Sequence, residues 1–104
     1  FMFDICGIWR VQRSRAVENQ AVSSDIPTLV LAGRYDPVTN TKWGELAAST
    51  LSNSFFYVFP NAAHGVFLSG DCPVNIVQAF LDNPATEPDS SCIDNIEMEF
   101  YVPE

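Results

Sequence analysis

The order of the predicted elements in this 104-residue chain indicates a parallel α/β fold. Two short apolar runs have the composition of buried strands. Each is followed by a loop and then by a segment whose apolar residues recur at helical spacing. Strand, loop, helix, strand, loop and helix in this order are typical of a parallel sheet with crossover helices.

The first strand is predicted over residues 28–32, where an unbroken aliphatic run is ended by Gly33. Such a run is the pattern of a strand buried on both faces. After a loop that contains Asp36-Pro37, a helix is predicted, with Thr39 or Asn40 as its N-cap. The apolar residues of that helix lie at i, i+3, i+4 and i+8 and form one face: Trp43, Leu46, Ala47 and Leu51.

The second strand is predicted over residues 55–59, which are aromatic and β-branched and are followed by Pro60. Pro73 is expected to be the first residue of a second helix, because proline is tolerated where a helix begins. That helix is expected to end near Asn83, and four residues form its apolar face: Ile76, Val77, Phe80 and Leu81.

The charge of the chain is strongly negative and unevenly distributed. Thirteen acidic residues outnumber five basic ones, which gives a formal net charge of −8. A nucleic-acid surface needs clustered Lys and Arg, so neither nucleic acid nor an anionic membrane surface is expected as a partner. No Lys or Arg follows Lys42, and seven acids lie in residues 82–104. Residues 84–104 are therefore expected to form an acidic, solvated tail.

The two ends of the chain carry further expectations. Residues 1–25 are expected to be an N-terminal connecting segment, and residues 26–83 the α/β part. The chain begins with Phe1, and its apolar opening is too short to span a bilayer and lacks the basic leader of a signal peptide. We therefore expect a fragment or processed product. Near the other end, apolar residues alternate over 96–102 and predict a short edge strand.

The three cysteines leave two interpretations open. Cys6, Cys72 and Cys92 are an odd number, so at least one thiol has no partner within this chain. A bridge between Cys72 and Cys92 would close a loop of about 20 residues and indicate an oxidising compartment. Buried free thiols explain the same residues without a bridge. With no CxxC pair and a single His, a structural zinc site is not expected, nor is any cofactor.

Asp36 and His64 are the candidate catalytic residues. Asp36 follows the first predicted strand by four residues, and His64 follows the second by five. Loops after parallel strands meet at one edge of the sheet, so the two side chains are expected to lie close together. A carboxylate that orients an imidazole is the acid–base half of an acyl-transfer triad, and the order acid then histidine is that of α/β-hydrolases. Taken alone, each residue is more often an ordinary turn or loop residue than a catalytic one.

Longer stretches around both residues carry a family resemblance. Residues 24–39 and Trp43-Gly44 resemble the C-terminal region of α/β-hydrolases of the tripeptidyl-aminopeptidase type, which are relatives of proline iminopeptidases. The sequence of residues 24–39 is Ser-Asp-Ile-Pro-Thr-Leu-Val-Leu-Ala-Gly-Arg-Tyr-Asp-Pro-Val-Thr. The catalytic-histidine loop of that family is similar to residues 60–66, Pro-Asn-Ala-Ala-His-Gly-Val. Its closing helix and cysteine pair are similar to residues 72–92. The resemblance implies the C-terminal βαβα portion of an α/β-hydrolase sheet, incomplete on its own.

The resemblance also implies roles for individual residues. Asp36 is then the acid and His64 the base of a Ser-Asp-His triad, and a disulfide joins Cys72 to Cys92. Cys6 resembles a family cysteine that pairs upstream of this chain. The activity implied is that of a secreted or periplasmic serine hydrolase that acts on peptide or ester substrates, in particular a peptidase that releases short N-terminal peptides.

This chain departs from the family pattern in two ways. Thr39-Asn40-Thr41 stands where the family usually has Thr-Pro-Pro, a small change at the start of a helix. No Gly-x-Ser-x-Gly occurs anywhere, so the nucleophile is expected from the remaining, upstream part of the hydrolase. On this hypothesis the chain alone is inactive and exposes apolar surface through which it self-associates. The alternative hypothesis is a non-catalytic binding or assembly module derived from such a hydrolase.

Overall fold

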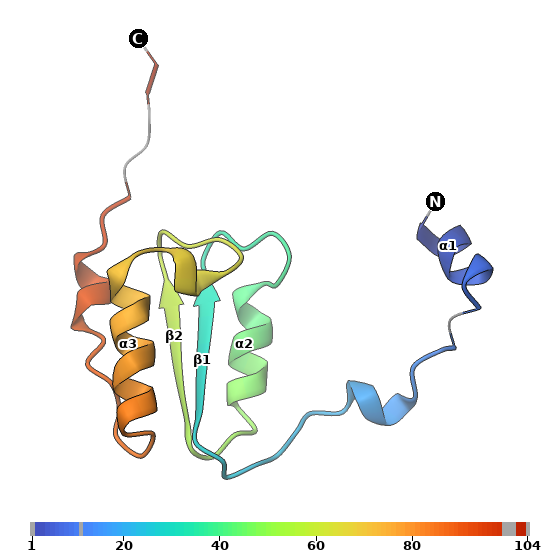
Figure 1. Ribbon diagram of the computed structural model, residues 1–104, viewed down its shortest axis with the longest axis horizontal. Coiled ribbons are helices and arrows are strands. Elements are labelled where there is room, and N and C mark those ends of the chain that lie inside the picture. Colours follow the sequence, from blue (N-terminus) through green and yellow to red (C-terminus); the bar gives the residue numbers. More distant parts are fainter. Residues whose placement is uncertain (1, 11, 99–101, 104) are drawn as a thin grey trace.

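The computed structural model describes residues 2–10, 12–98, 102 and 103. Its centre is a two-stranded parallel sheet in which β1 (Thr28–Gly33) pairs with β2 (Ser54–Phe59). Helix α2 (Thr41–Ala48) connects the strands, and α3 (Asp71–Asp82) follows β2 (Figure 1). The predicted order of strand, helix, strand and helix is therefore confirmed, and the fold is α/β.

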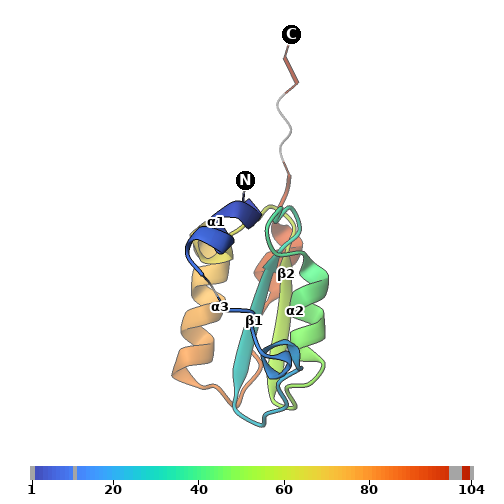
Figure 2. The ribbon, with the colours of Figure 1, turned by 90° about the vertical axis from the view of Figure 1, so that its right-hand side faces the viewer.

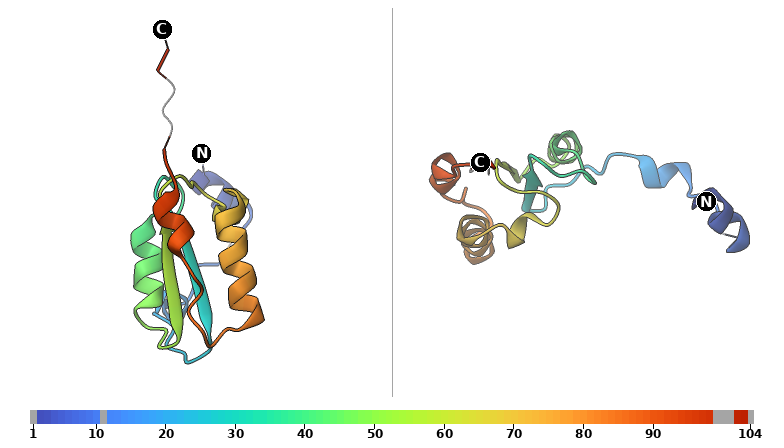
Figure 3. Two further views of the ribbon diagram at one scale, coloured as in Figure 1. Left: turned by 90° about the vertical axis from the view of Figure 1, so that its left-hand side faces the viewer. Right: turned by 90° about the horizontal axis from the view of Figure 1, so that it is seen from above.

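The two helices lie on opposite faces of the sheet (Figure 3). The face toward α3 holds the core, where Phe59, Ala62, Val66 and Ile76 are buried together. Leu29, Leu31 and Tyr57 pack against this cluster from the strands. Because side chains alternate between the faces of a strand, Val30 and Phe56 lie on the opposite face, beneath α2.

Helix α2 contacts the sheet through a side that the sequence pattern does not mark. Gly44 lies over Phe56, so closely that a Cβ there would be 2.9 Å from the aromatic ring. The predicted apolar face points elsewhere, because Trp43 is 65% exposed and Leu46 is 55% exposed. Close approach of the backbone at Gly44, rather than burial of large side chains, sets how this helix packs.

Most element boundaries differ from the predictions by one or two residues. Helix α2, however, ends at Ala48, so Leu51 lies outside the helix in which it was predicted and forms an isolated parallel bridge with Ser24. Asn40 is the N-cap of α2, and its Oδ1 accepts a hydrogen bond from the backbone N–H of Lys42 at 3.0 Å. Helix α3 begins at Asp71, two residues before Pro73. The first-turn N–H groups of a helix have no intrahelical acceptor, so proline fits at the third position as well as at the first.

The segment after α3 is partly packed, which differs from the expectation of a solvated tail. Pro88 is buried, and the hydroxyl of Tyr57 donates to its carbonyl oxygen at 3.2 Å. The short 3-10 helix η3 (Ser91–Asn95) brings Cys92 and Ile93 against the core. Apolar residues among the acidic ones supply this contact. The predicted edge strand is not formed at residues 96–98, and residues 99–101 lie outside the described part of the chain.

The N-terminal segment extends away from the sheet (Figure 1). It contains α1 (Met2–Ile8), which was not predicted, and the 3-10 helix η1 (Ala16–Asn19). Phe3, Ile8 and Trp9 are largely exposed there. No helix among the described residues is long and apolar enough to cross a membrane.

Candidate active site

The two loops that carry Asp36 and His64 are joined by backbone hydrogen bonds. The N–H of Arg34 donates to the carbonyl of Phe59 at 3.0 Å, which extends the ladder between β1 and β2 by one step. The N–H of Tyr35 then donates to the carbonyl of Ala62 at 3.0 Å. These bonds fix the relative position of the loops one residue before Asp36 and two residues before His64.

Gly33 allows the loops to approach so closely. A Cβ at this position would lie 2.6 Å from the carbonyl oxygen of Ala62 and closer still to that of Ala63. Carbon and oxygen atoms that are not bonded do not approach to such distances. Glycine is therefore required here for its lack of a side chain, because the histidine loop occupies the space that a side chain would fill.

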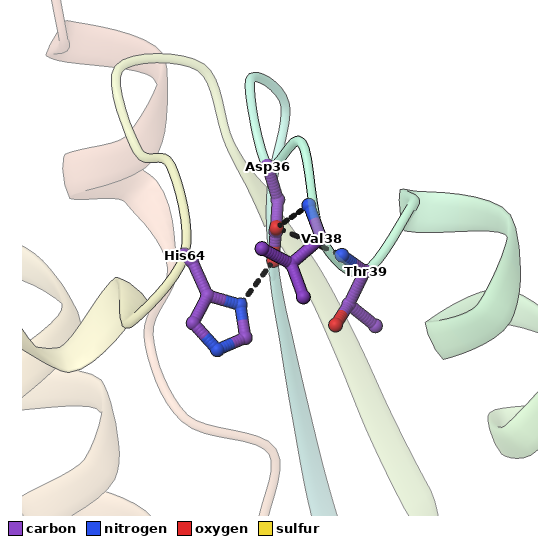
Figure 4. A network of polar contacts seen from close by, with 4 residues as sticks. All are labelled: Asp36, Val38, Thr39 and His64. Carbon is purple, nitrogen blue, oxygen red and sulfur yellow. Dashed lines mark hydrogen bonds and ion pairs between the residues drawn. The ribbon is translucent and has the colours of Figure 1, made fainter. Parts of the chain in front are cut away.

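The carboxylate of Asp36 is oriented by its own loop (Figure 4). Its Oδ1 accepts hydrogen bonds from the backbone N–H groups of Val38 at 2.7 Å and Thr39 at 2.8 Å. The side chain is only 8% exposed. The bond from Thr39 is the main cause that lowers the pKa of Asp36 below its ordinary value, and hydrogen bonds from His64 and Val38 lower it further against the opposing effect of burial.

The carboxylate of Asp36 in turn orients the imidazole ring of His64. Its Nδ1 lies 3.0 Å from Oδ2 of Asp36, and the other ring nitrogen points away from the carboxylate (Figure 4). An ionised carboxylate only accepts hydrogen bonds, so in the neutral imidazole Nδ1 carries the proton and Nε2 keeps its lone pair. The histidine side chain is 62% exposed, which leaves Nε2 accessible.

The residue after His64 turns the chain in a way that favours glycine. Gly65 has φ of 84° and ψ of 52°, in the left-handed region, and it precedes the 3-10 helix η2 (Val66–Leu68). Val66 is buried in the core directly after this turn. The turn thus holds the histidine in the loop while the following residue enters the core.

An open cleft of about 410 Å³ borders the pair. Among the residues that the structure describes, Asp36 is the only carboxylate that lines it, and both of its oxygens already accept hydrogen bonds. The rest of the lining is apolar or uncharged apart from His64 itself: Leu31, Ala32, Thr39, Asn40, Gly44, Gly65, Val66 and Phe67. Among the described residues, no hydroxyl or thiol is hydrogen bonded to His64. The described residues therefore hold an oriented carboxylate–imidazole pair to which no hydroxyl or thiol is bonded.

The cysteines are arranged as the resemblance implied for Cys72 and Cys92. These two form a disulfide that joins the first turn of α3 to η3, with 5.8 Å between their Cα atoms. Cys6 on α1 is an exposed free thiol. No cluster of three or more His, Cys, Asp or Glu side chains suited to a metal ion occurs within the described residues.

Sequence reasoning singled out Asp36 and His64, and the structure places them in direct contact. The sequence did not predict the backbone that supports this contact, namely the two loop-to-loop hydrogen bonds and the close approach at Gly33. The glycine after the histidine was a usable signal for the left-handed turn, because few other residues adopt that conformation. The hydrogen bonds from Arg34 and Tyr35 could not be predicted, because their donors are backbone N–H groups that do not depend on the side chain.

Comparison with known proteins accounts for most of the chain. A family model described as TAP-like protein, from the α/β-hydrolases, matches residues 2–92. The comparisons with curated proteins and with solved structures found no match. The matched range includes both strands, both catalytic candidates and the disulfide. On this match, the chain belongs to the TAP-like family, as a region similar to the C-terminal part of tripeptidyl-aminopeptidase-like α/β-hydrolases.

Proposed function

We propose that this chain is the C-terminal part of a secreted serine peptidase that releases short peptides from the N-termini of its substrates. The observation that carries the proposal is the 3.0 Å contact between Nδ1 of His64 and Oδ2 of Asp36. Two backbone N–H groups hold the other carboxylate oxygen, so the acid is positioned before any substrate binds. Membership of the TAP-like family supports a hydrolase, and the choice of a peptide over an ester substrate rests on the resemblance alone.

In this proposal His64 transfers one proton in each direction. Nε2 removes the proton from the hydroxyl of a serine on an upstream segment while the serine oxygen bonds to the substrate carbonyl carbon. The imidazolium then gives that proton to the leaving amine as the scissile C–N bond breaks. Asp36 remains ionised throughout and stabilises the imidazolium through Oδ2. Water repeats the cycle on the acyl-enzyme and releases the peptide.

The disulfide supports a location outside the reducing cytosol. Structural disulfides persist in secreted and periplasmic proteins and are rare where glutathione keeps thiols reduced. Cys72 and Cys92 are paired and partly buried against the core, which fits a structural bridge rather than a redox site. Cys6 is free and exposed in this chain, and in the proposed enzyme it pairs with a cysteine of the upstream segment.

The test is covalent labelling of the complete polypeptide, made by joining this chain to its native upstream sequence. A fluorophosphonate probe is expected to label a serine upstream of residue 1, and His64→Ala is expected to reduce the labelling rate by at least about 1,000-fold. Asn61→Ala is the matched control, because Asn61 is an exposed residue of the same loop. Undiminished labelling in His64→Ala would overturn the assignment of the base, and absence of labelling in the unmodified protein would favour a non-catalytic module.

A further inference from the structure

The loop that carries His64 is anchored in the core on both sides of the histidine. Ala62, two residues before it, is 1% exposed, and Val66, two residues after it, is 8% exposed. Both belong to the buried cluster on the face of the sheet toward α3. The side chain of His64 between them is 62% exposed. The position of the imidazole therefore depends on how firmly its two buried neighbours are held.

The two anchors are held in different ways. The carbonyl of Ala62 accepts the 3.0 Å hydrogen bond from Tyr35, which ties this anchor to the loop of the acid. Around Val66 the backbone hydrogen bonds are local, because the N–H groups of Leu68 and Ser69 donate to carbonyls of the same turn at 2.9 Å. Within the described part of the chain, no hydrogen bond joins η2 to another element. Apolar packing thus holds Val66 in place.

The C-terminal segment, residues 88–96, completes the core in which Val66 is buried. Cys92, Ile93 and Ile96 pack against the buried cluster from this segment, and Cys72 does so from the first turn of α3. Figure 2 shows η2 at the upper end of α3, next to that first turn. In Figure 1, η3 lies beside the same end of α3. The disulfide therefore joins the segment to the helix at the end of the core that supports the histidine loop.

We propose that the C-terminal segment is a positioning element for His64. Through the disulfide and its apolar contacts, the segment keeps Val66 in the core and so keeps Nδ1 of His64 at Oδ2 of Asp36. Asp36 does not depend on the segment, because backbone N–H groups of its own loop hold its Oδ1. The positioning of the imidazole stands on this geometry, and only its consequence for catalysis rests on the proposed function.

Loss of the disulfide is expected to displace the base while the acid stays in place. Without the bridge, the segment is held by its apolar contacts and by the hydrogen bond from Tyr57 to Pro88. Packing around Val66 then loosens, and His64 moves with it because a single residue separates the two. A displacement of about 1 Å at a catalytic group costs on the order of 100-fold in rate.

The tautomer of His64 reports this positioning directly. His64 is the only histidine of the chain, so the imidazole signals in heteronuclear NMR spectra belong to it. In the unmodified chain at alkaline pH, the Nδ1–H tautomer is expected to dominate, because the carboxylate only accepts hydrogen bonds. In the Cys72→Ser/Cys92→Ser double variant, the ratio of Nδ1–H to Nε2–H is expected to fall at least about 10-fold, since a hydrogen bond to a charged acceptor is lost.

Two single variants separate positioning from stability. Ile96→Ala keeps the disulfide and removes one apolar contact of the segment, so a smaller shift of the tautomer ratio in the same direction is expected. Phe55→Leu is the matched control. It removes the edge contact with Phe80, in which the ring centroids are 6.3 Å apart, at the opposite end of the interface between the sheet and α3. This variant is expected to leave the tautomer ratio unchanged.

In the complete polypeptide, the double variant is expected to lower the rate of fluorophosphonate labelling about 100-fold, and Phe55→Leu to leave it unchanged. An unchanged tautomer ratio in the folded double variant would overturn the proposal. If the double variant does not fold, an unchanged ratio in Ile96→Ala would overturn it. An equal shift in Phe55→Leu would do the same, because general destabilisation would then explain the effect. A tautomer shift in a protein that the probe never labels supports the positioning and rejects the serine hydrolase.

Discussion

Gly33→Ala tests whether the close approach of two loops positions the acid and the base. The added Cβ would lie 2.6 Å from the carbonyl oxygen of Ala62, so the histidine loop must retreat by at least about 0.4 Å to reach the shortest contact that real Cβ atoms show. The same carbonyl accepts the 3.0 Å bond from Tyr35. A retreat of this size takes that bond to the limit of hydrogen-bonding geometry and moves His64 away from Asp36.

Two magnitudes follow from this displacement. Overpacking of this kind is expected to lower the free energy of unfolding by about 1 to 3 kcal/mol, measured by urea denaturation of this chain. Misplacement of the base is expected to reduce the rate of fluorophosphonate labelling of the complete polypeptide by roughly 10- to 100-fold. Gly7→Ala is the matched control, because no described atom outside its chain neighbours and its own helix backbone lies within 4 Å of a Cβ added there. Labelling of Gly33→Ala at the unmodified rate, with unchanged stability, would refute the reasoning.

Three further predictions concern the acid, the turn after the histidine and the disulfide. Asp36→Asn is expected to slow labelling by about 10⁴-fold, because the amide stabilises the wrong tautomer of His64. Asp89→Asn is the control: it also removes a carboxylate bonded to a backbone N–H, and it should leave the labelling rate unchanged. Folding lowers the pKa of Asp36 from 3.8, so its ionised form stabilises the fold at neutral pH. This stabilisation is lost as the pH falls below 3.8. Asp36→Asn should therefore flatten the pH dependence of the free energy of unfolding below that pH. Gly65→Ala is expected to cost about 1 to 2 kcal/mol in urea denaturation, because φ of 84° is strained for alanine, and a midpoint equal to that of the unmodified chain would contradict the assigned turn. The double variant of Cys72 and Cys92 to serine is expected to lose about 3 kcal/mol, and a reductant should then have no further effect on its unfolding midpoint.

The strands and the topology could be predicted because local composition decides them. The aliphatic run over residues 28–32 and the aromatic run over residues 55–59 are too apolar for an exposed loop and are ended by Gly33 and Pro60. The packing of α2 could not be predicted from periodicity. Its large apolar residues, such as Trp43, indicate a buried face, but the close contact of Gly44 with Phe56 decides which side meets the sheet.

The acid–base pair could be predicted because parallel topology brings the ends of neighbouring strands to one edge. Asp36 and His64 follow their strands at similar distances, so their proximity depends only on the order of the elements. The 3.0 Å contact depends on more, namely the backbone bond from Tyr35 and the missing side chain of Gly33. Helix α1 was missed because only seven residues form it, too few for a helical repeat of apolar residues to be recognised.

The loop-to-loop bonds through main-chain atoms have a consequence for engineering. Arg34 and Tyr35 hold the histidine loop through their backbone N–H groups, while both residues are exposed. Any residue except proline keeps those donors. A saturation library at these two positions therefore changes the charge and shape of the loop surface while the backbone bonds that bring Asp36 and His64 together are kept.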